Sequence, residues 1–209
     1  MNIDTLVRNN VKKMSSYSSA RDDFKKENDK KLIYLDANES PFDNGINRYP
    51  DNKHTELKKV VSNIKKVNVN QVVFGNGTDE ILDLIVRVFC NPSEDKIITL
   101  PPTYGMYDVI AKTNGVENIE IPLKSDFSID KNEILKLSSK KTKILFLCSP
   151  NNPTGNSFDT NNLTDLIKSF KGIVVVDEAY IDFSSKPVSY THLRAHETEA
   201  DLVCRLLLE

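Results

Sequence analysis

The stretch KILFLCSPNNPTG, residues 143–155, decides the predicted fold because it joins an apolar run to a rigid polar loop. Its first part, residues 143–150, is apolar enough for a buried strand. Pro150 and Pro153 then fix the backbone and remove two hydrogen-bond donors, so Asn151 and Asn152 should be held in fixed orientations. An ordinary turn is the alternative for this loop.

On both sides of this stretch, short apolar segments that predict strands alternate with amphipathic segments that predict helices of about ten residues. Such alternation is typical of an α/β domain with a mostly parallel sheet and flanking helices. The predicted strands are 72–77, 95–100, 117–123, 143–150 and 172–180, and the predicted helices are 51–67, 78–89, 103–115, 129–139 and 162–170. Because ligands bind at the carboxyl ends of the strands in these sheets, we expect the chemistry there.

A second strand end carries the segment GNGTDE, residues 75–80. Its glycines permit a tight turn, and Thr78 and Asp79 open the next helix. The first N–H groups of a helix lack internal partners and add to the positive end of its dipole, so this turn should bind a phosphate. A plain turn with a capped helix is the alternative.

A third strand end is VVVDEAY, residues 174–180, in which three β-branched residues lead to Asp177. An acid at the end of a buried strand is costly unless a cation or a donor meets it. Asp177 therefore either pairs with a cation, such as a protonated ring nitrogen, or caps the following element. A phosphate site, an orienting Asn and a buried acid are together what a protein needs to hold pyridoxal phosphate.

Seven motifs occur in a fixed order along the chain. They are SSYSSAR (15–21), LDANESP (35–41), NRYPD (47–51), GNGTDE (75–80), PPTYGMY (101–107), CSPNNPTG (148–155) and DEAYIDF (177–183). In this order the chain resembles the fold-type I aminotransferases that use pyridoxal phosphate, and among them the histidinol-phosphate aminotransferases. The resemblance spans about residues 5–185, and it implies an incomplete large domain of that fold.

The resemblance implies that eight residues bind the cofactor, seven of them in one chain and the eighth, Tyr49, from the partner subunit. Gly77, Thr78 and Asp79 would lie at its phosphate, Tyr104 on its ring face, Asn152 and Tyr180 at its 3′ oxygen, and Asp177 at its ring nitrogen. The protonated nitrogen would then withdraw electrons from the α-carbon of the substrate.

The resemblance also implies a homodimer, because Tyr49 corresponds to the tyrosine that reaches the cofactor phosphate of the partner subunit. Tyr17 and Asn38 correspond to residues that close over the substrate. The implied substrates are histidinol phosphate and 2-oxoglutarate, which the family converts to imidazole-acetol phosphate and glutamate in histidine biosynthesis.

The chain is predicted to contain three segments: an N-terminal arm (1–30), a truncated cofactor-binding domain (31–187) and a non-native tail (188–209). The family's cofactor-binding lysine follows DEAY in a Ser-Lys segment, and Lys186 occurs too early and without that context. We therefore expect no catalytic residue in this chain, and we expect the fragment to be inactive.

The tail, residues 188–209, can be back-translated into two blocks of sequencing-library adapter separated by the length of a sample index. It contains His192 and His196, which are four residues apart like metal ligands on a helix. The adapter interpretation predicts no metal site there.

Composition excludes several other classes of protein. The formal net charge is −2, with acidic and basic residues interspersed, which predicts neither a nucleic-acid nor a membrane partner. No apolar run is long enough to cross a bilayer. Cys90, Cys148 and Cys204 show no CxxC spacing, so a reducing, cytoplasmic location is expected.

Two alternatives stay open from the sequence. One is another aminotransferase, or a lyase that acts on phosphate-bearing amino acids, with the same fold. The other is a nucleotide-binding α/β module without catalysis.

Overall fold

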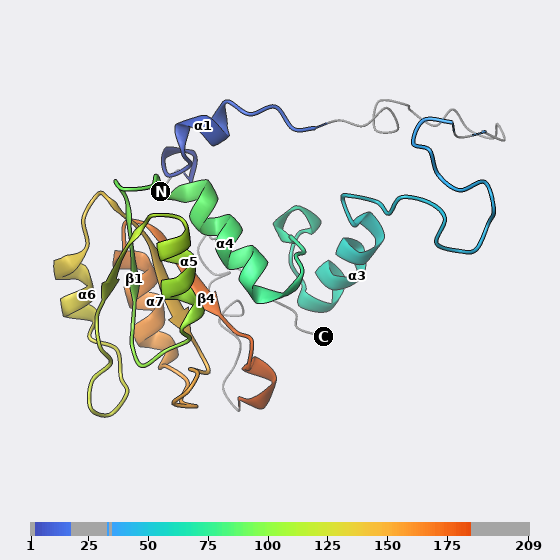
Figure 1. Cartoon of the computed structure of the whole chain (residues 1–209). Coiled ribbons are helices and arrows are strands. Elements are labelled where there is room, and N and C mark those ends of the chain that lie inside the picture. The colour runs from blue at the N-terminus through green and yellow to red at the C-terminus, as the bar shows by residue number, and fades with distance from the viewer. Residues whose placement is uncertain (1–2, 18–32, 34, 185–209) are drawn as a thin grey trace. The chain divides into compact units, whose positions relative to one another are not determined.

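The computed structural model describes residues 3–17, 33 and 35–184 (Figure 1). The chain divides into two compact units: Met1–Lys12 with Phe74–Glu209, and Lys13–Val73. Lys186, His192, His196 and the predicted tail lie outside the described residues.

The first unit is built on a four-stranded sheet in the order β2-β1-β3-β4. Its strands are β1 (Lys96–Thr99), β2 (Glu117–Glu120), β3 (Thr142–Cys148) and β4 (Ile173–Asp177). Every pair of neighbours is parallel. The predicted α/β class with a mostly parallel sheet is therefore confirmed.

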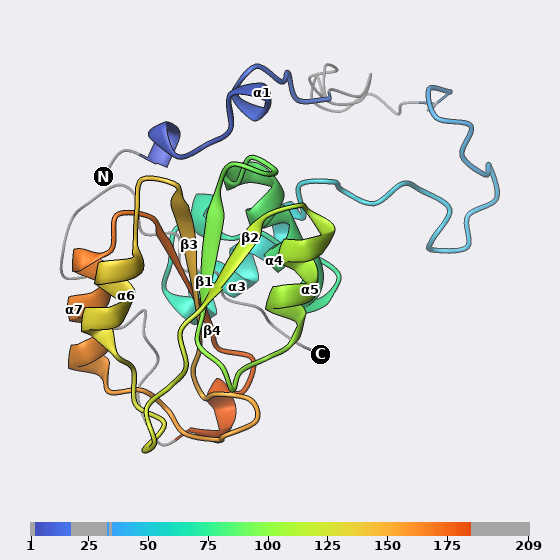
Figure 2. The ribbon, with the colours of Figure 1, turned by 60° about the vertical axis from the view of Figure 1, so that its left-hand side comes forward.

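Helices cover both faces of this sheet (Figure 2). One face is covered by α4 (Gly77–Phe89) and α5 (Met106–Thr113), and the other by α6 (Lys131–Leu137) and α7 (Thr160–Ser169). Side chains of β3 alternate between the two faces, as strand geometry requires: Phe146 faces α4 and α5, whereas Leu147 faces α6 and α7. Strands β1, β3 and β4 are therefore buried between two layers of helices, whereas the edge strand β2 is partly exposed.

The chain leaves β1 toward β2 on one side and later returns to place β3 on the other side of β1. The strand order therefore reverses beside β1, and in open parallel sheets such a point leaves a crevice at the carboxyl ends of the strands. This geometry brings together the loops that follow β1, β3 and β4.

The N-terminal residues of this unit form two short helices, η1 (Ile3–Thr5) and α1 (Asn9–Lys12). Leu6 and Val7 pack against the α4 side of the core. The backbone N–H of Arg8 donates to Val88 O at 3.0 Å, so this segment is anchored to the end of α4.

One predicted strand, 72–77, is wrong. The segment has no strand assignment, and none of the described strands pairs with it. Val73 is 64% exposed, whereas Val72 is buried. A short apolar run becomes a strand only where a neighbour accepts its backbone hydrogen bonds, and that neighbour cannot be read from the run itself.

The second unit contains α3 (Thr55–Lys65) and the short helix η2 (Val69–Gln71). The predicted helix 51–67 is therefore present but shorter. Three of its apolar side chains, Leu57, Val60 and Ile64, are 49%, 55% and 66% exposed. Within the part of the chain that the structure describes, no helix is long and apolar enough to cross a membrane.

Candidate cofactor site

A cavity of about 240 Å³ lies at the carboxyl ends of β3 and β4. Its walls come from the first turn of α4 and from the loops that follow β1, β3 and β4. The lining residues are Asn76, Gly77, Thr78, Asp79, Tyr104, Cys148, Asn152, Asp177, Ala179 and Tyr180. Seven of the eight residues that were predicted to bind the cofactor are among them, and the eighth, Tyr49, belongs to the second unit.

The phosphate-binding prediction falls on the start of α4. Asn76 is the residue before the helix, yet its side chain makes no capping hydrogen bond. Thr78 is buried, and its Oγ1 has no hydrogen-bond partner. Gly77 has a φ of 78°, and an added Cβ would meet no atom within 4 Å, so this turn leaves open space above the helix start. An uncapped helix start with an unpartnered hydroxyl fits a phosphate group better than it fits a plain capped turn.

Asp177 also lines the cavity, and this residue is 2% exposed. Its Oδ2 accepts a hydrogen bond from the Tyr107 hydroxyl at 2.8 Å, and its Oδ1 accepts one from the N–H of Ala179 at 3.0 Å. Burial nevertheless raises the pKa of this carboxyl above its ordinary value, and these two hydrogen bonds only partly oppose the effect. A cation in the cavity would relieve this cost, and a protonated ring nitrogen meets that requirement.

Two tyrosines connect these walls. The Tyr104 hydroxyl donates to Asp79 Oδ1 at 3.2 Å, which holds its ring at the cavity. Burial first, and the Asp79 carboxylate second, raise the pKa of Tyr104. Tyr104 packs edge-on against Tyr107, with ring centroids 5.6 Å apart. Tyr107 was not predicted as a site residue, although it is the second tyrosine of PPTYGMY.

The loop after β3 gives its two asparagines different roles. Asn151 is buried: its Oδ1 accepts from the Thr103 hydroxyl at 2.9 Å, and its Nδ2 donates to Pro102 O at 2.9 Å. Asn151 thus ties this loop to the loop that follows β1. Asn152 lines the cavity. The predicted rigid loop therefore depends on one asparagine for its shape and presents the other.

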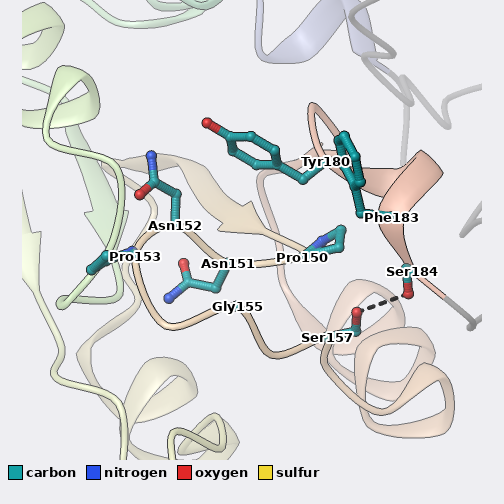
Figure 3. A pocket seen from close by; sticks show the side chains of 9 residues that line it. All are labelled: Pro150, Asn151, Asn152, Pro153, Gly155, Ser157, Tyr180, Phe183 and Ser184. Atoms are coloured by element: carbon teal, nitrogen blue, oxygen red, sulfur yellow. Dashed lines mark hydrogen bonds between the residues drawn. The ribbon is translucent and has the colours of Figure 1, made fainter.

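A second cavity, of about 520 Å³, is also lined by this loop. Figure 3 shows its lining, with Asn152 and Tyr180 pointing to the same side and Asn151 pointing away from them. Asn152 and Tyr180 line both cavities. Tyr180 is 44% exposed, so its hydroxyl can be reached from outside the fold.

The other three predicted site residues, Tyr17, Asn38 and Tyr49, belong to the second unit. Tyr17 and Tyr49 are 87% and 70% exposed. Glu39 connects two motifs here, because its carboxylate accepts from the Arg48 side chain at 2.7 Å and from the N–H of Tyr49 at 2.8 Å. The roles of all ten predicted residues remain predictions.

The fold and this site define a class of protein, and the sequence comparison agrees with it. The chain belongs to the class I and II aminotransferases: the sequence profile of the family described as "Aminotransferase class I and II" matches residues 23–206.

Among similar proteins are histidinol-phosphate aminotransferases. That of Flavobacterium psychrophilum is 56% identical over 192 residues, which is 92% of this chain and 55% of the relative. That of Flavobacterium johnsoniae is 53% identical over 184 residues, or 88% of this chain and 53% of the relative. The chain thus spans about half the length of these curated relatives.

Solved structures show the same fold. The histidinol-phosphate aminotransferase of Clostridium acetobutylicum is 29% identical with a TM-score of 0.60, covering 68% of this chain and 41% of that one. That of Sinorhizobium meliloti, in complex with pyridoxal-5′-phosphate, is 20% identical with a TM-score of 0.59, covering 66% of this chain and 38% of that one. At 20% identity, the similarity to the Sinorhizobium meliloti structure concerns the fold alone.

Proposed function

We propose that the parent protein to which this chain belongs is a pyridoxal-phosphate-dependent aminotransferase of histidine biosynthesis. It would convert histidinol phosphate and 2-oxoglutarate to imidazole-acetol phosphate and glutamate. The observation that carries the proposal is that one cavity is lined both by a helix start without a side-chain cap and by a buried carboxylate. The 56% identity to a histidinol-phosphate aminotransferase supports the particular substrate.

Each end of the cofactor would meet a different part of the cavity. The first N–H groups of α4 and the Thr78 hydroxyl would hold its phosphate, and Tyr104 would cover one face of its ring. Asn152 and Tyr180 would donate to its 3′ oxygen. Asp177 would pair with its ring nitrogen and keep that nitrogen protonated.

When bound, the cofactor supplies an electron sink for the α-carbon of the substrate. The chain's own residues supply orientation and charge. Asp177 keeps a negative charge at the ring nitrogen, while the buried Asn151 network holds Asn152 in place. Every residue assigned here lines the cavity except Asn151, which acts through the loop.

The remaining assignments concern substrate and partner. Tyr17 and Asn38 would close over the substrate, and Tyr49 would reach the cofactor phosphate of the partner subunit in a homodimer. The interspersed charge and the lack of CxxC spacing support a cytoplasmic enzyme that binds small molecules, without a nucleic-acid or membrane partner.

The test has two parts, both on the complete product of the gene. The first is calorimetric titration with pyridoxamine 5′-phosphate, which binds without a covalent link, and saturable binding at one site per chain is expected. The second is glutamate formation from 2-oxoglutarate with histidinol phosphate as amino donor. Weaker binding of pyridoxamine 5′-phosphate by Asp177→Asn, with an unchanged far-ultraviolet spectrum, is expected to accompany loss of the product.

The same assay separates the alternatives. Activity with alanine or tyrosine but not with histidinol phosphate would contradict the substrate and keep the class. Binding of a nucleotide in place of pyridoxamine 5′-phosphate would contradict the class. The family match favours the aminotransferase over a non-catalytic nucleotide-binding module.

A further inference from the structure

Tyr107 lies behind the cavity wall and contacts the buried carboxyl of Asp177. It stands in the first turn of α5, is fully buried, and donates its hydroxyl hydrogen to Asp177 Oδ2 at 2.8 Å. It is absent from the lining of the cavity. It therefore acts on a bound molecule only through the lining residues it touches, and its hydroxyl bonds to Asp177.

The ring of Tyr107 is held from two sides. It stacks on Phe146 of β3, with centroids 4.8 Å apart and planes 3° apart, and it meets the Tyr104 ring edge-on at 87°. A phenol fixed in this way cannot swing its hydroxyl away from Asp177 without opening the core. Burial also raises the pKa of Tyr107 far above its usual range, so the hydroxyl stays a donor.

The Asp177 carboxylate keeps lone-pair positions that a donor in the cavity can use. Ala179 N–H occupies one position on Oδ1, and the Tyr107 hydroxyl occupies one position on Oδ2. A carboxylate accepts about four hydrogen bonds, so capacity remains for a donor in the cavity. The other titratable groups that interact with it, Asp79, Tyr104 and Cys148, bring no positive charge.

We propose that Tyr107 is a positioning residue, whose hydroxyl fixes the Asp177 carboxylate in the orientation and the ionised state that pair with a protonated ring nitrogen. The inference deepens the proposed function and rests on it. The hydroxyl stabilises the ionised carboxylate by a charge-assisted hydrogen bond. The proton shared by the pair then resides on the ring nitrogen and not on Asp177.

The first readout needs no cofactor. The ¹³C carboxyl signal of Asp177, assigned by its loss in Asp177→Asn, is titrated in the wild type and in Tyr107→Phe. The midpoint is expected to rise by about one to two pH units in Tyr107→Phe, which corresponds to loss of one hydrogen bond to a charged group. Tyr104→Phe is the matched control, because it removes a neighbouring hydroxyl that bonds to Asp79.

The second readout is the ring ¹⁵N signal of labelled pyridoxamine 5′-phosphate bound to the same variants. Tyr107→Phe is expected to move this signal toward that of an unprotonated pyridine, whereas Tyr104→Phe leaves it in the protonated range. If Tyr107→Phe does not fold, 3-fluorotyrosine at position 107 replaces it. As a stronger donor that keeps the ring, it is expected to lower the carboxyl midpoint.

The outcomes separate the two proposals. If the wild type binds no pyridoxamine 5′-phosphate, the proposed function and this inference both fail. If it binds, but Tyr107→Phe leaves both signals at their wild-type positions, only the inference fails. An equal displacement in Tyr104→Phe also overturns it, because a general effect of losing a hydroxyl would then explain the result.

Discussion

At the scale of single residues, the buried carboxylate of Asp177 is expected to lower the stability of the cofactor-free protein and to strengthen cofactor binding. Its pKa is raised in the folded protein because the carboxyl is buried. The folded state then binds this proton more tightly than the unfolded chain does. The contribution of the group to the free energy of unfolding is therefore fully present below its unfolded pKa, and it is lost as the pH rises through the folded pKa.

Asp177→Asn is accordingly expected to have opposite effects on stability and binding. Asn can accept from the Ala179 N–H with Oδ1 and donate to the Tyr107 oxygen with Nδ2, so it keeps one hydrogen bond to each neighbour. The free energy of unfolding of the cofactor-free wild type should fall as Asp177 ionises with rising pH, and this fall should be absent in the variant. Pyridoxamine 5′-phosphate should bind about 10- to 100-fold more weakly, because a hydrogen bond to a charged group is lost.

Urea unfolding of the cofactor-free protein between acid and neutral pH, together with calorimetric titration of the ligand, tests this prediction. If the free energy of unfolding changed with pH in the same way in the wild type and the variant, ionisation of the buried Asp177 carboxyl would not destabilise the fold, and the prediction would be wrong.

The sequence predicted which residues at the strand ends line the site, but it did not predict the different structural role of each one. The motif order pointed to Asn152 and Asp177, and both line the cavity. The sequence alone could not distinguish the role of Asn151 from that of Asn152. The two roles differ because only Asn151 forms hydrogen bonds to the loop that follows β1. Tyr107 was missed for a related reason: its partner lies 70 residues away in the chain.

At the scale of elements, periodicity was sufficient where a segment packs against the sheet. The amphipathic helices and the buried strands from 78 to 177 are present, with ends shifted by a few residues. The backbone pairing of β2 continues past its last assigned residue, since Ile121 N–H donates to Thr99 O at 2.9 Å and Leu123 N–H to Pro101 O at 2.8 Å. The wrong strand, 72–77, has the same kind of apolar run but no described strand beside it.

The contact between β3 and the start of β4 depends on Gly172. A Cβ at this position would lie 2.5 Å from Lys143 O and 2.7 Å from Phe170 Cε1. The carbonyl belongs to the strand itself, so it cannot move aside without shifting β3. We expect Gly172→Ala to lower the free energy of unfolding by about 1–3 kcal/mol.

Gly105→Ala is the matched control, because an added Cβ at position 105 meets nothing within 4 Å. Denaturant unfolding of both variants should show a large change only for Gly172→Ala. Equal midpoints for the two would contradict the close approach of β3 and β4.

At the scale of the whole molecule, the proposed homodimer makes each active site depend on two chains. Asp177 and Asn152 line one cavity of one chain. Tyr49 is assigned to the cofactor of the partner subunit, and its side chain is 70% exposed. A complete site would then combine Asp177 and Asn152 from one chain with Tyr49 from the other.

This arrangement predicts complementation between inactive variants of the complete gene product. A hybrid dimer of Tyr49→Ala and Asp177→Asn contains one site with both residues intact and one site with both changed. Random mixing of equal amounts makes half of the dimers hybrids, so about a quarter of the wild-type activity should return. If Tyr49 served the cofactor of its own chain, no site in the hybrid would be complete, and activity would stay absent.

Asn152→Ala mixed with Asp177→Asn is the matched control for this experiment. Both residues line the same cavity, so every site in that hybrid keeps one change and no activity should return. Glutamate formation after subunit exchange measures both mixtures. Recovery in the first mixture alone assigns Tyr49 to the partner's site, whereas recovery in both would mean that exchange had restored activity by a route other than a shared site. Since the exposed Tyr49 has a function in this scheme only when a second chain is present, the complementation result decides whether the dimer is part of the catalytic unit.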